Sequence, residues 1–449
     1  MIEKYKLYVG LLFLFLWISL CWGFVQDELF PGLEAVRSPM FLMADLVFLL
    51  LGAYALRDRR DIRIFISFVI ILLVSAVLNR QGVVTVLNGS RGFIGVLFAA
   101  PVIRMMLTSK HFERFETSFD RQMLIFLFLQ AICITWQFFK YGPGDYVGGS
   151  MGEGASGTIS VLIYFISFYL MCKRWNHECS YFFNLRKNLL LILLLYPTFL
   201  NETKISLVLF VFYFILLVRI DRHVLGKAVK LLPVVGVLSV GAVTVYSYVV
   251  DTEASDVFSE ANMYNYFIGE DIDYLIDVAM KVQDQEIETD NVWAVDIPRI
   301  SKLVLAPVIL DETGGKVWLG AGVGQFKGTS VIGQTPFARK YNWFLQGSRP
   351  LLFFILMQLG VVGLVWMLIN LITIVQTDST RKFAWNIRLY LYLLVAMSML
   401  YNDSFRLFPY CFILFYIAMS GLEHIQDRCS RDLTNATTCE RSDAVSASK

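Results

Sequence analysis

The side chains that could do chemistry fall in a few short polar segments of a mostly apolar chain. The longest segment, residues 251–349, contains Arg299, Lys302 and Arg349. Arginine offers a planar fork of donors to phosphate oxygens, and lysine offers a point charge. Four shorter segments add further polar residues: Asn88-Gly89-Ser90-Arg91, residues 144–156, Asn201-Glu202-Thr203-Lys204 and Asn402-Asp403-Ser404-Phe405-Arg406. If these segments meet, Arg91, Lys204 and the three cations of the long segment form a cationic pocket with few carboxylates.

Ordinary turn chemistry is the alternative explanation for some of these segments. Asn, Gly and Ser are common in short loops, so for residues 402–406 both interpretations stay open. For the segment from Asn201 to Lys204 the alternative is weaker, because the flanking apolar stretches are short and would place the charges at or below a membrane surface, where a buried pair needs a partner or a purpose. The glycine-rich stretch 142–157 indicates either a loose linker or a nest of backbone N–H groups open to a phosphate or sugar.

Three carboxylates are candidates for a general base. Glu202, Asp145 and Glu153 are preferred in that order, because they lie in the predicted outer polar layer, which also holds basic residues. We expect no metal, since no dense cluster of carboxylates or histidines occurs in these segments. No cofactor is expected either.

The elements that must position these residues are transmembrane helices. Hydrophobic residues make up 57% of the 449-residue chain, charged residues make up 17%, and the mean hydropathy is +0.59. A water-soluble protein of this length could not keep so much apolar surface from solvent. Apolar runs near the length of a bilayer crossing predict about twelve helices, at residues 7–25, 40–56, 64–78, 92–107, 123–139, 157–172, 189–200, 205–218, 231–250, 351–375, 389–400 and 407–422.

The distribution of Lys and Arg predicts the orientation. With a cytoplasmic N-terminus, 25 of the 39 basic residues fall in cytoplasmic segments, as the positive-inside rule requires. Both termini are then cytoplasmic and the segment 251–349 is outside. This predicts nine spans in residues 1–250, a large extracytoplasmic loop with short helices at 251–349, three spans in 350–422, and a disordered cytoplasmic tail at 423–449.

The long loop carries several local signals. Residues 270–282 and 294–309 have the apolar periodicity of amphipathic helices. Arg299 and Lys302 are three residues apart on the second helix and so share one face, either as a phosphate clamp or as a solvated pair. The glycines from Gly320 to Gly324 indicate a tight turn, and Tyr341 is a candidate for stacking on a sugar ring, although loop aromatics pack into a core at least as often.

The order of these features resembles the O-antigen polymerase and O-antigen ligase superfamily. The residues that carry the resemblance span roughly 82–370. They are the glycine segment 145–156, Asn201-Glu202-Thr203-Lys204, Arg299 with Gly315 and then Gly320-Ala321-Gly322-Val323-Gly324-Gln325-Phe326, and Asn342-Trp343-Phe344-Leu345 before Gln358-Leu359-Gly360.

This resemblance implies a helical membrane glycosyltransferase of the bacterial inner membrane with an extracytoplasmic active site. Arg299 matches the family's arginine of the large loop and would hold the diphosphate of a polyprenyl-diphosphate-linked oligosaccharide, while a second lipid-linked unit attacks. The family's other arginine has no match, and Arg91 or Lys204 would substitute for it. Implied partners are these lipid-linked glycans, membrane lipid, a flippase and a chain-length regulator, with no nucleic acid.

Two alternatives to a repeat-unit polymerase stay open. The first alternative is a ligase, which transfers glycan to an acceptor. Ligases of this superfamily have a histidine near the motif that matches Asn342, where this chain has Tyr341. The four histidines all lie on the predicted cytoplasmic side, which favours the polymerase. The other alternative is a flippase for the same lipid-linked unit, which would place charged residues near the membrane midplane on broken helices.

Overall fold

Helices make up all the regular secondary structure in the described part of the chain. The computed structural model describes residues 2–144, 146–176, 179–201, 205–217, 241, 244, 297–312, 317–326, 335–345, 350–375 and 384–420. Within these residues, seven helices are long and apolar enough to cross a membrane. The predicted all-α class is therefore confirmed for the described residues, and the helices agree with a multi-pass membrane protein.

Six of the seven candidate spans lie in the first 174 residues. They are built from α1 (Ile2–Phe24), α2 (Glu34–Ala55), α3 (Arg59–Leu78), α4 with α5 (Val83–Ser90 and Ile94–Leu107), α6 (Phe112–Tyr141) and α7 (Ser156–Arg174). The seventh is α18 (Leu351–Val375). Four further apolar helices are shorter, at Leu189–Leu200, Ile205–Leu216, Asn386–Tyr401 and Phe408–Ser420. The predicted span 231–250 is described only at residues 241 and 244, so the count of twelve stays a prediction.

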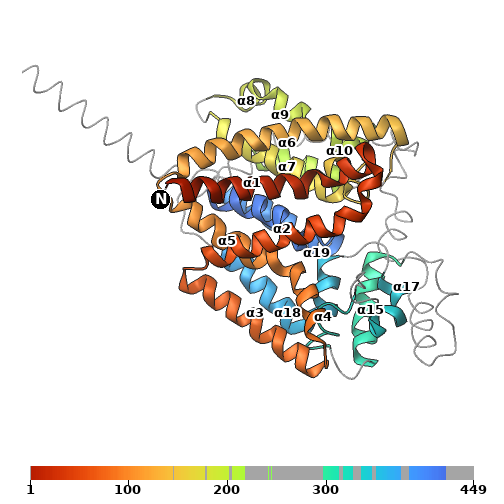
Figure 1. Cartoon of the computed structure of the whole chain (residues 1–449). Coiled ribbons are helices and arrows are strands. Elements are labelled where there is room, and N and C mark those ends of the chain that lie inside the picture. Colours follow the sequence, from red (N-terminus) through yellow and green to blue (C-terminus); the bar gives the residue numbers. More distant parts are fainter. Residues whose placement is uncertain are drawn as a thin grey trace, which may run out of the picture.

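The core of the bundle forms around α7 and the helix Phe408–Ser420. Of the apolar stretch of α7 that could cross a membrane, 89% is buried in the protein, whereas only 17% of the corresponding stretch of α3 is buried. Figure 1 shows α1, α2, α6 and α7 running side by side, with α3 and α18 along one flank. Aromatic stacking joins the layers: the rings of Phe48 and Phe408 lie 4.1 Å apart, and those of Phe119 and Tyr416 lie 4.0 Å apart. Such contacts replace the hydrophobic driving force that helices lack in lipid.

α18 is interrupted at Gly360. This residue has a φ of 66°, and a Cβ there would lie 2.3 Å from the backbone of Trp318. The turn at 317–326 fills the gap: the Ala321 N–H donates to the carbonyl of Met357, and the Val361 N–H donates to that of Val317. The backbone groups released by the break are thus satisfied by protein, the condition for irregular backbone at membrane depth.

The predicted tight turn at Gly320 to Gly324 is confirmed, since its three glycines all have positive φ. It is anchored on α3, where Ser75 and Asn79 donate to the carbonyls of Leu319 and Gly320. A Cβ at Gly324 would meet the Thr85 carbonyl oxygen of α4 at 2.1 Å. The turn therefore locks together α3, α4 and α18.

The middle of the glycine-rich stretch before α7, residues 147–152, packs against α1 and α6, whereas residues 143, 146, 153 and 154 are exposed. The Gly149 N–H donates to Gln137 and the Ser150 N–H donates to Gln130, at 2.7 and 2.9 Å. The Glu153 N–H donates to Asp27. These N–H groups already have partners within the protein, so they do not form the open anion nest that the sequence suggested. Residues 147–150 are buried and hydrogen-bonded, so this part of the stretch is not a loose linker.

The part of the predicted loop that the structure describes is helical and packs on the bundle. α15 (Arg299–Glu312) lies against α18 and α19 (Ala384–Tyr401), and α16 (Pro336–Lys340) leads into α17 (Asn342–Leu345). Figure 1 shows α15, α17 and α4 gathered at one end of the bundle. The predicted helix 294–309 is observed from Arg299, directly after Pro298. The predicted helix 270–282 and the tail 423–449 lie outside the described residues.

Candidate functional site

Arg91 forms an ion pair with Asp45 inside the candidate spans. Its Nη2 and Nε lie 2.6 and 2.8 Å from one carboxylate oxygen of Asp45, and Nη1 donates to Asn88. Asp45 lies midway along α2, and Arg91 lies at the start of the 3-10 turn η3 (Arg91–Phe93) that links α4 to α5. Placing an ionisable group within a membrane span costs free energy, so such a group is by default a candidate functional residue. The guanidinium of Arg91 is largely occupied by this pair.

Arg406 lies next to the Arg91 pair, on the turn η6 (Ser404–Arg406). Its Nη1 lies 2.6 Å from Asp403, and its guanidinium carbon lies 4.2 Å from the ring centre of Phe354. A Cβ at Gly92 would lie 3.3 Å from Arg406 Nε, so the glycine makes room for the guanidinium. Gly92 directly follows Arg91, so this contact places Arg406 and Asp403 next to the pair of Arg91 and Asp45.

Two donors of this turn lack a partner among the described residues. They are Nε of Arg406 and Nδ2 of Asn402, and both are buried. A buried polar group without a hydrogen bond costs about 1–3 kcal/mol. Such donors are accordingly the groups that an oxygen-rich ligand would satisfy.

Arg299 reaches the same end of α19 from α15. Its Nε donates to the carbonyl of Tyr401 at 3.2 Å, and its guanidinium carbon lies 4.7 Å from the centre of the Tyr401 ring. The next carbonyl, of Asn402, accepts from the Leu351 N–H at 3.0 Å. Arg299 is thus held on the bundle by backbone and aromatic contacts.

The beginning of α7 completes the polar layer. A Cβ at Gly157 would lie 2.7 Å from the Tyr401 ring and 3.6 Å from Asn402 Nδ2. Thr158 and Ser404 share a hydrogen bond between their hydroxyls. Asn201 donates to Ser160 at 2.7 Å. The structure therefore brings together parts of four predicted polar segments: those of Arg91, Ser156, Asn201 and Arg406, with Arg299 beside them.

Other predicted site residues lie elsewhere or in different surroundings. Lys302 is 0% exposed, which excludes the solvated pair with Arg299. Tyr341 is 2% exposed and packs 4.8 Å from the Phe337 ring. The ring therefore packs in the core, as the second of the two interpretations of this residue proposed. Glu153 is exposed beside Asp27 of the N-terminal segment. Asp145, Glu202, Lys204, Arg349 and the side chain of Asn342 lie outside the described residues.

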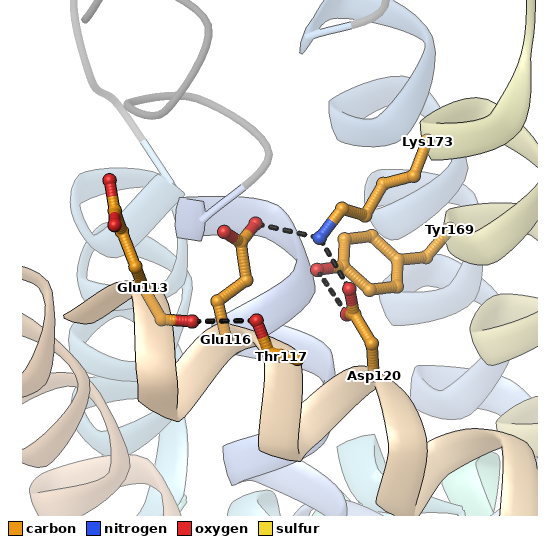
Figure 2. Close-up of polar contacts among 6 residues, drawn as sticks. All are labelled: Glu113, Glu116, Thr117, Asp120, Tyr169 and Lys173. Carbon is orange, nitrogen blue, oxygen red and sulfur yellow. Dashed lines mark hydrogen bonds and ion pairs between the residues drawn. The ribbon is translucent and has the colours of Figure 1, made fainter. Parts of the chain in front are cut away.

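A second charged cluster joins the beginning of α6 to the end of α7. It therefore lies at the end of α7 opposite to the polar layer. Figure 2 shows Lys173 between two carboxylates, 2.7 Å from Glu116 and 2.5 Å from Asp120. The Tyr169 hydroxyl donates to Asp120 at 3.0 Å. Another pair, Arg104 with Asp61, joins α5 to α3. The three charges of Lys173, Glu116 and Asp120 thus satisfy one another, with the Tyr169 hydroxyl on Asp120.

Sequence reasoning missed several partners in both clusters. Arg104 pairs with Asp61, 43 residues earlier in the chain, and no sequence motif links the two residues. Asp45 was not linked to Arg91, from which it is separated by 46 residues. The contact between Arg299 and Tyr401 could not be predicted, because no sequence motif contains both residues.

Comparison with known proteins adds no assignment to this geometry. No known protein family, characterised protein or solved structure matches the chain significantly. The function must therefore be argued from the residues of the chain itself.

Proposed function

We propose that this chain is a polymerase that joins polyprenyl-diphosphate-linked oligosaccharide repeat units into a surface polysaccharide. It would be a glycosyltransferase of the bacterial inner membrane, with both termini cytoplasmic and the reaction at the outer face. The resemblance to the O-antigen polymerase and ligase superfamily motivates the proposal. The observation that carries it is the position of Arg299, which reaches from α15 to the Tyr401 carbonyl at the end of α19. Tyr401 directly precedes Asn402, whose Nδ2 has no partner in the described part of the chain.

The chemistry requires few protein groups. A hydroxyl oxygen of the acceptor unit bonds to the anomeric carbon of the donor, while the bond from that carbon to the diphosphate oxygen breaks and its electron pair leaves with the diphosphate. Cationic donors stabilise the charge that develops on this leaving group, and holding both units supplies proximity. Arg299 and Arg406 would serve as these donors. The hydroxyl proton passes to a carboxylate, for which Glu202, Asp145 and Glu153 are the candidates.

The assignment of the second cation changes with the observed contacts. Arg91 was the expected substitute for the family's missing arginine, but it is bound by Asp45 and Asn88. Arg406 has a buried Nε without a partner in the described part of the chain. We therefore assign the second phosphate contact to Arg406, with Arg91 holding Asp45 and the start of α5 in place.

A flippase is the second candidate, and two observations favour it. α18 is broken at Gly360, and the pair of Asp45 with Arg91 lies within candidate spans. Transporters use broken helices and charges near the midplane in this way. Charges are also not confined to one end of the bundle, since Lys173 and Arg104 form ion pairs toward the other end. The polymerase is preferred because α15 brings Arg299 to the charged end.

Deletion of the gene in its own host tests the proposal, with the length of lipid-linked and surface glycan as the measurement. We expect single repeat units on the carrier and no long chains. Full-length glycan stranded on its lipid would instead indicate a ligase. Repeat units confined to the cytoplasmic leaflet would indicate a flippase, and an unchanged glycan profile would overturn all three.

A further inference from the structure

Two arginines at the charged end of the bundle each lie against an aromatic ring from another helix. The guanidinium carbon of Arg299, on α15, lies 4.7 Å from the ring centre of Tyr401, at the end of α19. That of Arg406, on η6, lies 4.2 Å from the ring centre of Phe354, on α18. Phe354 is buried, and a ring attracts a cation most strongly where water is excluded. Both rings are therefore placed to hold a guanidinium.

The other cation–ring contacts in the described part of the chain are local. They join Arg57 to Tyr54, Lys140 to Tyr141, Lys173 to Tyr169 and Lys340 to Tyr341. Partners this close in sequence lie near each other whatever the rest of the fold does. Arg299 and Arg406 instead meet their rings because separate helices pack together. Their two contacts are thus a product of the tertiary fold, at the end of the bundle where the polar segments gather.

Each of the two rings packs against a glycine of a further helix or turn. A Cβ at Gly157, in the first turn of α7, would lie 2.7 Å from Cε1 of Tyr401. A Cβ at Gly92, on η3, would lie 3.1 Å from Cζ of Phe354 and 3.3 Å from Nε of Arg406. A side chain at either position would press on the ring or the guanidinium. The Tyr401 carbonyl also accepts from Nε of Arg299, so the ring and its own backbone fix this arginine together.

We propose that Tyr401 and Phe354 are positioning residues, which hold the guanidinium groups of Arg299 and Arg406 in place for the diphosphate. The assignment rests on the proposed function. Arginine has a long side chain, which loses rotamer entropy when it is ordered. Stacking on a ring fixes the guanidinium plane before the substrate arrives. A ring is also neutral, so it orients the cation without cancelling its charge, whereas a carboxylate would compete with the diphosphate.

Two substitutions of Tyr401 separate the ring from the backbone carbonyl. The full-length protein is reconstituted in vesicles with lipid-linked repeat units, and kcat and KM are measured. Tyr401→Leu should lower kcat about tenfold with KM nearly unchanged, because a poorly placed Arg299 stabilises the leaving diphosphate less. Tyr401→Phe keeps the ring and should recover most of the wild-type kcat. Equal losses in the two variants would overturn the role of the ring.

Phe354→Leu should give a different kinetic signature. Because Arg406 is assigned to binding, loss of its ring should raise KM about threefold with little change in kcat. Phe48→Leu is the matched control, since Phe48 is a buried ring that stacks on Phe408. This control should lower the unfolding temperature and leave both constants unchanged. If all the ring variants lowered activity only in proportion to lost stability, the rings would be packing residues alone.

A double variant tests whether Tyr401 acts through Arg299. Arg299→Ala/Tyr401→Leu should be about as active as Arg299→Ala, because the ring has no guanidinium left to position. Losses that multiply would show that Tyr401 acts independently of this arginine and would overturn the proposal.

Chemical modification gives a readout that does not depend on activity. The protein in detergent, without substrate, is treated with phenylglyoxal, which reacts with guanidinium groups, and the modified peptides are mapped by mass spectrometry. Tyr401→Leu should speed the modification of Arg299 several-fold, and Phe354→Leu should do so for Arg406. Tyr401→Phe and Phe48→Leu should not. An unchanged rate at Arg299 in Tyr401→Leu would overturn the proposal.

Failure of the positioning role and failure of the proposed function are distinguishable. If the wild type makes polymer but the modification rates do not respond to the ring variants, the positioning role fails and the function stands. If the rates respond as expected but the wild type makes no polymer, the proposed function fails, and the rings still hold the two arginines.

Discussion

Two charged clusters lie inside this bundle, and they differ in how completely their polar groups are satisfied. Between α6 and α7, Lys173 is shared by Glu116 and Asp120, and Tyr169 donates to Asp120 (Figure 2). At the other cluster, Arg91 and Arg406 pair with Asp45 and Asp403, yet Arg406 Nε and Asn402 Nδ2 are left without partners in the described residues.

This difference separates a structural role from a binding role. A buried ion network whose members satisfy one another links helices and leaves no group for a ligand. Unsatisfied buried donors carry a cost that a bound oxyanion can remove. Charge within the spans is therefore a weaker indicator of a site here than an unsatisfied donor beside Arg299. Each prediction below changes one side of this comparison.

The largest effect is expected for Arg299→Ala. Loss of one preorganised donor to the leaving diphosphate should lower polymer formation roughly 10²- to 10³-fold, measured as glycan length and turnover in reconstituted vesicles. Arg299→Lys should also be impaired, since a point charge cannot replace a planar fork. Arg339→Ala is the control, because Arg339 is an exposed arginine on α16 of the same polar segment. Near-normal polymer from well-inserted Arg299→Ala protein would refute the phosphate contact.

Lys173→Met tests the satisfied cluster. It leaves Glu116 and Asp120 without their shared cation. Removing one partner of a fully buried pair costs about 3–5 kcal/mol, and we expect about 2 kcal/mol here because the Lys173 side chain is 33% exposed. The measurement is thermal unfolding of the full chain in detergent. The double variant Lys173→Met/Glu116→Gln should recover part of the loss. Polymer length from the folded fraction should stay unchanged, and a shortened polymer would assign this cluster a catalytic role.

Arg406→Ala has a smaller expected effect on activity than Arg299→Ala. Removing one charged contact to the diphosphate should raise KM about tenfold, with kcat less affected. Asp403→Asn provides the sharper control: it releases Arg406 from its ion pair, so affinity for the lipid-linked unit should be retained or increased. If both variants lose affinity equally, the pair of Asp403 and Arg406 acts as a structural unit.

The bundle helices and the turn at Gly320 to Gly324 could be predicted because their signals are local. Apolar runs of spanning length located seven helices, and the alternating glycines indicated a turn whose positive φ values are observed. The break in α18 could not be predicted. Residues 351–375 form a predominantly apolar run of spanning length. The break at Gly360 depends on the turn at 317–326, an earlier segment of the chain whose backbone bonds to Met357 and Val361.

The site was harder to predict because its contacts join distant segments. The glycine stretch looked open to phosphate because Gln130 and Gln137, which occupy its N–H groups, come from the preceding helix α6. Tyr341 looked available to a sugar because a motif cannot show that Phe337 and the core cover its ring. Arg299 could be chosen from the resemblance, but its contact with the Tyr401 ring depends on the packing of α15 against α19.

Asp120→Asn should produce the smallest effect and so gives the strictest test of the comparison. Lys173 keeps Glu116 at 2.7 Å, and an amide of the same shape can still accept from the Tyr169 hydroxyl. Because Asp120 is itself 27% exposed, its pair with Lys173 should contribute less than about 1 kcal/mol to stability. Thermal unfolding should shift slightly, and glycan length should not change. A loss of polymer with an unchanged unfolding temperature would show that this carboxylate acts in function, and that satisfied partners do not identify a structural cluster.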